Sequence, residues 1–190
     1  MTSLDKAAFY KAVRGKLFGA SLDQNEVDGC EAVLAALSGL PLAYQAYGLA
    51  TAYHETAATM QPVREAFHLS EAWRKAHLRY YPHYGRGYVQ LTWPQNYARA
   101  DRELGLGGSL IANPDVAMRS DVAAKVMRYG MIEGWFCPGK SFSTYLPANG
   151  PAGHDQFVSA RRIINGMDRA ETVAVYADIF QKALQAGGMR

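Results

Sequence analysis

Two segments of the chain carry the side chains best suited to acid–base chemistry. The first is Tyr-His-Glu-Thr at residues 53–56, which contains Glu55, and a second acid follows at Glu65. The other covers residues 80–93 and combines several tyrosines with two glycines, an arginine and the amide of Gln90. Hydrolysis of a glycosidic bond requires one acid to protonate the leaving oxygen and another to activate water. Together, the two segments favour a glycoside hydrolase that acts on a polysaccharide.

Glu55 is the candidate general acid. On a continuous helix its neighbours one turn before and after are all small, namely Thr51, Ala52, Ala58 and Thr59. They leave room for a ligand beside the carboxyl, and apolar surroundings help a carboxyl to keep its proton. The alternative is a surface glutamate in a helical ion pair, which this pattern disfavours because no Lys or Arg occupies those four positions.

Glu65 is the candidate second acid. It follows a break at Pro62 and therefore need not lie on the same helix as Glu55. Inverting glycosidases separate their two carboxyl groups by roughly 6.5–9.5 Å so that a water molecule fits between base and sugar. A chain break followed by an acid is compatible with that separation. Glu71 is the competing candidate, and a Glu65 that is merely solvated is the alternative.

The run Tyr-Gly-Arg-Gly-Tyr at residues 84–88 predicts a loop in which the backbone approaches a ligand closely at two glycines. Arg86 is a candidate to pair with a catalytic carboxylate and hold it ionised. Tyr84 and its aromatic neighbours are candidates to stack on sugar rings, although part of this group is expected in the core. Neutral hydrogen bonds for sugar hydroxyls and for a nucleophilic water are offered by Gln90, Thr92 and Asn96.

Other chemistries find little support in the sequence. A zinc-protease motif requires a second His one helical turn after His54, and that position is Ala58. The remaining histidines show no ligand spacing, so we expect no metal and no cofactor. The two cysteines, Cys30 and Cys137, are too far apart for a metal knuckle or redox motif, and both are expected as reduced core thiols.

Composition indicates one ordinary globular catalytic domain over residues 1–190, without a separate wall-binding module. The net charge of +3 favours approach to an anionic polymer but is too small to indicate nucleic-acid binding. No apolar run is long enough for stable membrane insertion. The N-terminus lacks a basic region followed by an apolar block, so we expect no secretory signal. We therefore expect a monomer that is made in a host cytoplasm and acts on its substrate after release.

Hydrophobic periodicity is mostly helical along the chain. A helix is expected to open with Pro41 in its first turn and to run to about Thr59, so that Glu55 lies inside it. Residues 88–92 alternate and predict a short strand. The predicted fold class is mainly α, a lysozyme-like domain with two helical lobes and a small β element near residues 84–93.

These motifs resemble glycoside hydrolase family 19, which includes plant-type chitinases and the related phage lysozymes, or endolysins. The resemblance rests on the Tyr-His-Glu-Thr segment, on Tyr-Gly-Arg-Gly-Tyr-Val-Gln-Leu-Thr-Trp at residues 84–93, and on Asn96-Tyr97. The late segment Arg-Arg-Ile-Ile-Asn-Gly at residues 161–166 resembles a further family motif. The short chain and the lack of a secretion signal resemble the phage branch. One departure is Met167, which replaces a glycine of the family pattern.

The resemblance implies an inverting mechanism in a mainly helical, two-lobed fold. It implies that Glu55 is the general acid, that Glu65 lies in the region of the general base, and that Thr92 helps to place the water. It further implies substrate-binding amides at Gln90, Asn96 and Asn165.

The function that the sequence favours is an endolysin-type lysozyme, or muramidase. It would cleave the β-1,4 bond between N-acetylmuramic acid and N-acetylglucosamine in the glycan strands of peptidoglycan and so lyse bacteria. The nearest alternative is a chitinase on the same scaffold. An alternative of another class is a non-catalytic cell-wall-binding or virion protein, and a metalloenzyme is the third option.

Overall fold

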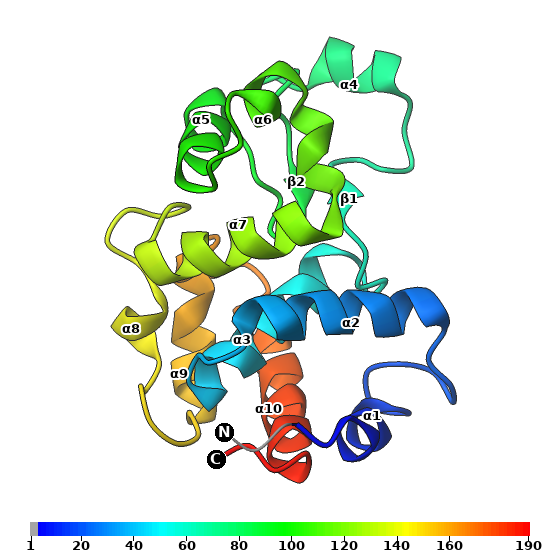
Figure 1. Ribbon diagram of the computed structural model, residues 1–190, viewed down its shortest axis with the longest axis vertical. Coiled ribbons are helices and arrows are strands. Elements are labelled where there is room, and N and C mark those ends of the chain that lie inside the picture. Colours follow the sequence, from blue (N-terminus) through cyan, green and yellow to red (C-terminus); the bar gives the residue numbers. More distant parts are fainter. Residues whose placement is uncertain (1–3) are drawn as a thin grey trace.

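The computed structural model describes residues 4–190 and consists mainly of helices joined by short connections (Figure 1). The elements in chain order are α1 (Lys6–Val13), α2 (Gln24–Leu37), α3 (Leu42–Glu55), β1 (Val63–Arg64), α4 (Glu71–His77), β2 (Arg86–Gly87), α5 (Pro94–Glu103), α6 (Ser109–Ala112), the 3₁₀ helix η1 (Pro114–Met118), α7 (Ser120–Glu133), α8 (Phe142–Tyr145), α9 (His154–Ala160), the 3₁₀ helix η2 (Arg161–Ile163) and α10 (Ala170–Ala186). None of the described helices is long and apolar enough to cross a lipid bilayer.

The elements form two groups, which we call the central lobe and the terminal lobe (Figure 1). The central lobe contains β1, β2, α4, α5 and α6, and the terminal lobe contains α1, α2, α3, α9 and α10 together with both chain ends. Helix α7 runs between the groups and packs against α2 on one side and against η1 and β2 on the other. The predicted mainly α, two-lobed architecture is therefore confirmed.

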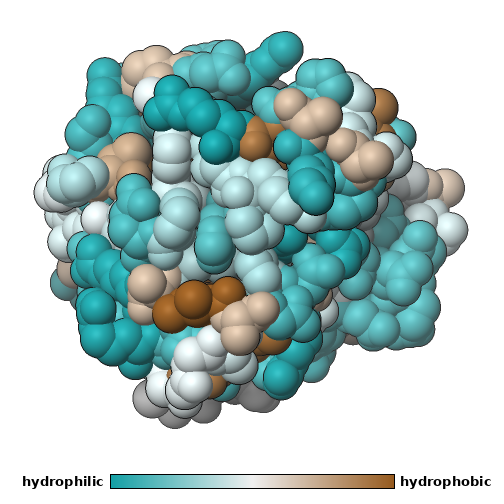
Figure 2. All heavy atoms as spheres, turned by 90° about the horizontal axis from the view of Figure 1, so that it is seen from above, coloured by the Kyte–Doolittle hydropathy of each residue, from teal (hydrophilic) through white to brown (hydrophobic). Residues whose placement is uncertain are grey.

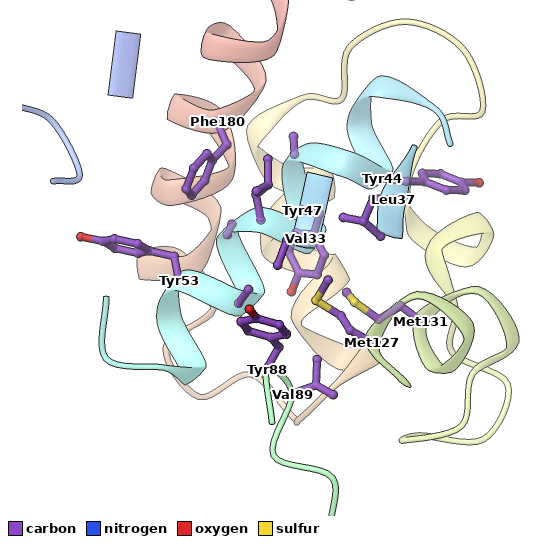
Figure 3. Close-up of a cluster of buried hydrophobic side chains, with 14 of the residues drawn as sticks. Val33, Leu37, Tyr44, Tyr47, Tyr53, Tyr88, Val89, Met127, Met131 and Phe180 are labelled. Atoms are coloured by element: carbon purple, nitrogen blue, oxygen red, sulfur yellow. The ribbon is translucent and has the colours of Figure 1, made fainter. Parts of the chain in front are cut away.

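Helix α3 is the centre of the terminal lobe. Every residue from Leu42 to Tyr53 is buried, because the helix is apolar on all sides and α2 and α10 pack against it. Figure 3 shows Tyr47 of this helix among core side chains that include Val33 of α2 and Met127 of α7. Burial of each large apolar side chain contributes about 1.5–3 kcal/mol. The helix that carries Glu55 is therefore a rigid support.

Helix α3 ends at Glu55, four residues earlier than the sequence predicted. The Thr56 hydroxyl donates to the carbonyl of Ala52 and accepts from the backbone N–H of Met60, which gives the chain an alternative to helical hydrogen bonds. Met60 is buried against Gly29 of α2, where a Cβ would lie 1.7 Å from the Met60 carbonyl oxygen. The tight turn that follows therefore places Glu55 at a helix end, with Ala58 and Thr59 outside the helix.

The β element near residues 84–93 is confirmed, but its strand is shorter and earlier than predicted. Strands β1 and β2 pair antiparallel, with Val63 opposite Gly87. Residues 88–90 form a turn that closes with two backbone hydrogen bonds between Arg86 and Leu91. Gln90 has a φ of 52°, a left-handed conformation that a strand cannot contain. The alternating pattern at 88–92 therefore belongs to a tight loop.

Candidate active site

Glu55 is sheltered and ion-paired. Its side chain is 15% exposed, and Oε1 accepts a 2.6 Å hydrogen bond from Nη1 of Arg161 on η2. Arg161 is itself buried, and its Nε donates to the carbonyl of Asp168. Residues 4–190 provide no hydrogen bond to Glu55 Oε2. The carboxyl is thus fixed in place without being enclosed.

The histidine beside Glu55 lies in surroundings that disfavour its charged form. Burial is the main cause that lowers the pKa of His54, and the charges of Arg161 and Arg169 lower it further against the opposing effect of Glu55. The His54 ring packs near Tyr176 of α10, with 6.3 Å between ring centroids. Among the described residues no group of three or more His, Cys, Asp or Glu has the arrangement of a metal site.

Glu65 follows β1 and is held by neutral donors of the central lobe. Its Oε2 accepts a 2.9 Å hydrogen bond from the backbone N–H of Gly85, and the Tyr80 hydroxyl lies 3.4 Å from Oε1. Gly85 permits this approach, because a Cβ there would lie 3.2 Å from Glu65 Oε2 and 2.7 Å from Oε1 of Gln90. Three predicted parts of the site, namely Glu65, the glycine-containing loop and Gln90, therefore converge at one point.

Glu71, the competing acid, is already bonded to two donors. It begins α4, and its Oε2 accepts from Nη1 of Arg74 at 3.1 Å and from the Tyr84 hydroxyl at 2.9 Å. Arg74 in turn donates to the backbone carbonyls of Glu65 and Ala66. In this structure Glu71 therefore supports the segment that carries Glu65.

Tyr84 and Arg86, predicted to bind substrate, are both buried in the central lobe. The Arg86 guanidinium lies 3.7 Å from the centroid of the Tyr84 ring, and Nε donates to Asp115 at 2.8 Å. Its Nη1 donates to the carbonyl of Pro82 and to the Tyr97 hydroxyl. Arg86 thus pairs with Asp115, a partner that the local sequence did not indicate. The structure leaves Tyr84 and Arg86 almost no exposed surface, and both fix the shape of the loop.

The carboxylate that pairs with this buried arginine also pairs with a second arginine. Asp115 on η1 accepts hydrogen bonds from Arg64 at 2.9 Å and from Arg86 at 2.8 Å. These two guanidinium groups, Arg64 first, hold the pKa of Asp115 below its usual value. The pairing ties β1 and β2 to η1.

The predicted hydrogen-bonding residues form a chain along the loop between β2 and α5. The Thr92 hydroxyl donates to the Gln90 carbonyl at 2.7 Å, and Asn96 Nδ2 donates to the Thr92 carbonyl at 2.9 Å. All three side chains are half-buried. Trp93 in the same loop has a φ of 78°, a strained conformation for a bulky residue, and its ring lies 4.5 Å from that of Tyr80. Trp93 is therefore next to Tyr80, whose hydroxyl lies near Glu65.

Asn165 lies in the terminal lobe, on the segment that supplies the partner of Glu55. Its backbone N–H donates to the Arg161 carbonyl, and its Oδ1 accepts from the backbone N–H of Gly166. The side chain is exposed. Arg161 itself is the residue that sequence reasoning missed as part of the site. The only signal was its place in the Arg-Arg-Ile-Ile-Asn-Gly motif.

Surface features outside these residues are modest. A cavity of about 970 Å³ lies between the two chain ends and α2, lined among others by Leu4, Leu34 and Met189, and none of the candidate site residues lines it. Seen from the end of the molecule that carries the central lobe, the surface is mostly hydrophilic with small hydrophobic patches (Figure 2).

Comparison with solved structures identifies the fold. The chain is similar to chitinase C from Streptomyces griseus HUT6037, with a TM-score of 0.57 and 20% identity over 98% of this chain and 77% of that one. A chitinase C mutant with Glu replaced by Gln gives 0.59 and 21%, over 98% and 93% of the two chains. A bacterial family 19 chitinase gives 0.54 and 22%, over 98% and 96%. No protein-family description and no curated protein sequence matches the chain. The mainly helical fold is thus that of the family 19 chitinases.

Proposed function

We propose that this chain is a glycoside hydrolase that cleaves the β-1,4 bond between N-acetylmuramic acid and N-acetylglucosamine in bacterial peptidoglycan. The observation that carries the proposal is the pair of carboxylates, each held by a different lobe and by different chemistry. Glu55 is fixed by a buried guanidinium in the terminal lobe, and Glu65 by a backbone N–H and a phenol in the central lobe. The shared chitinase fold supports a carbohydrate substrate.

In the proposed mechanism Glu55 protonates the oxygen of the leaving sugar. Its Oε2 carries the proton, because Oε1 is occupied by Arg161. Glu65 removes a proton from a water molecule that attacks the opposite face of the sugar ring, and Thr92 helps to hold that water. Inversion follows because attack and departure occur on opposite faces, and we expect the two carboxyl groups to be roughly 6.5–9.5 Å apart in the substrate complex.

In the proposed setting the protein is a phage endolysin. The enzyme accumulates in the cytoplasm of the host and reaches the wall after release, and the net charge of +3 favours its approach to the anionic wall.

Chitin hydrolysis is the second candidate, because all three structural neighbours described above are chitinases. The two substrates differ in the lactyl ether and the stem peptide of muramic acid. The test is mass spectrometry of the products from purified peptidoglycan and from chitin oligomers under identical conditions. We expect muropeptides with a hydrated reducing-end N-acetylmuramic acid.

The same experiment separates the alternatives. If products form from chitin oligomers and not from peptidoglycan, the enzyme is a chitinase and not a muramidase. Anhydro-muramic ends would indicate a lytic transglycosylase, in which no water is added. Sedimentation of the protein with cell walls without any product would indicate a binding protein.

A further inference from the structure

One of the arginines between residues 61 and 93, Arg79, differs from the others in its surroundings. Arg64, Arg74 and Arg86 each lie within 3.1 Å of a carboxylate oxygen. Arg79 is exposed, and residues 4–190 provide its guanidinium with neither an ion pair nor a hydrogen bond. An exposed arginine is most often only solvated, so the position of Arg79 decides whether it has a role.

Arg79 lies on a pair of aromatic rings next to Glu65. Its guanidinium carbon is 5.2 Å from the centroid of the Trp93 ring, which is within the range of a cation–π contact. The Trp93 ring lies 4.5 Å from that of Tyr80, and the Tyr80 hydroxyl lies 3.4 Å from Oε1 of Glu65. Three consecutive contacts therefore connect Arg79 to the candidate base.

The charges of Arg79 and Glu65 act on the same hydroxyl. Burial is the main cause that raises the pKa of Tyr80, and the negative charge of Glu65 and its hydrogen bond add to the increase. The positive charge of Arg79 opposes it. Arg79 therefore belongs to the surroundings of the candidate base, although it is not bonded to Glu65.

The ring that Arg79 contacts is carried by a strained backbone. Trp93 has a φ of 78°, which is an outlier for a bulky residue. Its N–H donates to the carbonyl of His83 at 2.9 Å, and Pro94, the first residue of α5, follows it. Such strain persists only where the surrounding structure fixes it, and it is concentrated at functional sites. It is a second observation, independent of charge, that indicates a ligand here.

We propose that Arg79 is a specificity-determining residue that pairs with a carboxylate of the muramic acid unit and so favours peptidoglycan over chitin. The inference rests on the proposed function. A guanidinium binds a carboxylate through two parallel N–H donors. Chitin has no carboxylate, whereas muramic acid has one on its lactyl group when the stem peptide is removed and others on the stem peptide when it is present. Both sources offer the same chemistry to Arg79.

The experiment compares Arg79→Gln with Arg14→Gln, which removes the same charge from an exposed arginine of the terminal lobe. The substrates are solubilised peptidoglycan strands, the same strands after an amidase has removed the stem peptides, strands whose carboxyl groups have been converted to amides, and chitin oligomers. We expect Arg79→Gln to lower kcat/KM about fivefold on strands that keep the contacted carboxylate, the size of a partly exposed ion pair. On amidated strands and chitin oligomers kcat/KM should stay within about twofold of the wild type.

The pattern across substrates distinguishes recognition from a structural role. A loss confined to intact strands assigns the contact to the stem peptide, and a loss that persists after amidase treatment assigns it to the lactyl group. An equal loss on amidated strands or chitin oligomers would show that Arg79 acts by supporting Trp93 or Glu65, and this would overturn the proposal. The same holds if no substrate shows a loss, or if Arg14→Gln shows the same loss through its effect on net charge.

Failure of the proposed function has a different signature. If the wild type releases no product from peptidoglycan, the muramidase assignment fails, and calorimetric binding of the same soluble strands then tests Arg79. A dissociation constant that rises about fivefold in Arg79→Gln on unmodified strands, and not on amidated ones, would support the contact. Equal constants for the two proteins, or no binding by the wild type, would overturn the inference.

Discussion

At the scale of single residues, Glu55 owes its position to a side chain 106 positions later in the sequence. The positions one helical turn before and after Glu55 in the sequence contain no cation. The partner comes instead from η2, where Arg161 is buried with its Nε bonded to the Asp168 carbonyl. A guanidinium fixed on both sides holds a carboxylate in one orientation.

The first prediction concerns this pair. Arg161→Gln should lower kcat by roughly 100-fold, because a displaced acid no longer reaches the leaving oxygen. It should also lower the free energy of unfolding by about 3 kcal/mol, because a mostly buried carboxylate loses its partner. Chemical denaturation and steady-state kinetics measure both effects, with Arg162→Gln as the neighbouring control. A variant that keeps full activity would show that Arg161 does not position the acid.

The second prediction decides between the two acids of the central lobe. Glu65→Gln should lower kcat by roughly 100-fold or more, the size of a lost general base. Glu71→Gln should retain kcat within about threefold, because the amide oxygen can still accept hydrogen bonds from Arg74 and Tyr84. Initial rates on peptidoglycan, with circular dichroism to confirm folding, provide the measurement. If Glu71→Gln lost more activity than Glu65→Gln, the general base would be Glu71.

At the scale of elements, the sequence predicted the type of each segment better than its boundaries. Pro41 correctly predicted the start of a helix to within one residue, since α3 begins at Leu42. Its end at Glu55 depends on Thr56 and on the contact of Met60 with Gly29, which lies in another helix. The alternation at residues 88–92 indicated a strand, but the hydrogen bonds between Arg86 and Leu91 close a turn there. The first difference arises partly from a contact between two helices and the second from a tight turn, and hydrophobic periodicity reports neither.

The third prediction concerns the start of α9 and α10. His154 lies between two carboxylates, with Nδ1 2.5 Å from Asp178 and Nε2 2.7 Å from Glu171. These two groups, Asp178 first, raise the pKa of His154. The stabilisation of the folded state by these two contacts of His154 is therefore fully present below the unfolded-state histidine pKa of about 6.5. It is lost as pH rises through the higher pKa of His154 in the folded state.

The variant His154→Ala should therefore melt below the wild type at about pH 6, and the gap should shrink towards alkaline pH. Thermal melts of both proteins across this range provide the measurement. The exposed His68→Ala is the control and should show no such trend. A gap that stays constant, or widens as pH rises, would mean that the charged imidazole does not join α9 to α10.

At the scale of the whole molecule, the sequence was sufficient for the architecture and only partly for the site. Helical periodicity and the motif at residues 84–93 predicted a mainly α, two-lobed fold, and the solved chitinases share that fold. Glu65, Gly85 and Gln90, all predicted to belong to the site, lie together because the loop that contains β2 pairs with β1. Arg86 shows what the local sequence cannot predict. It is buried against Asp115, which lies on η1, 29 positions later in the chain.

The division into lobes also explains why the two acids depend on different parts of the chain. The support of Glu55 comes from the last third of the sequence, and that of Glu65 from the middle. Linear sequence places them ten positions apart, but the fold attaches each to its own scaffold. A change in either scaffold is therefore expected to affect one acid without the other.

The most direct test of the account is the rate at which Glu55→Gln releases reducing ends from purified peptidoglycan, compared with the wild type. Gln preserves the shape of the side chain and a hydrogen bond to Arg161 but cannot donate a proton to the leaving oxygen. We expect a loss of roughly 100-fold or more in kcat with the melting temperature preserved. A folded Glu55→Gln protein that cleaves peptidoglycan at the wild-type rate would contradict the assignment of Glu55 as the acid.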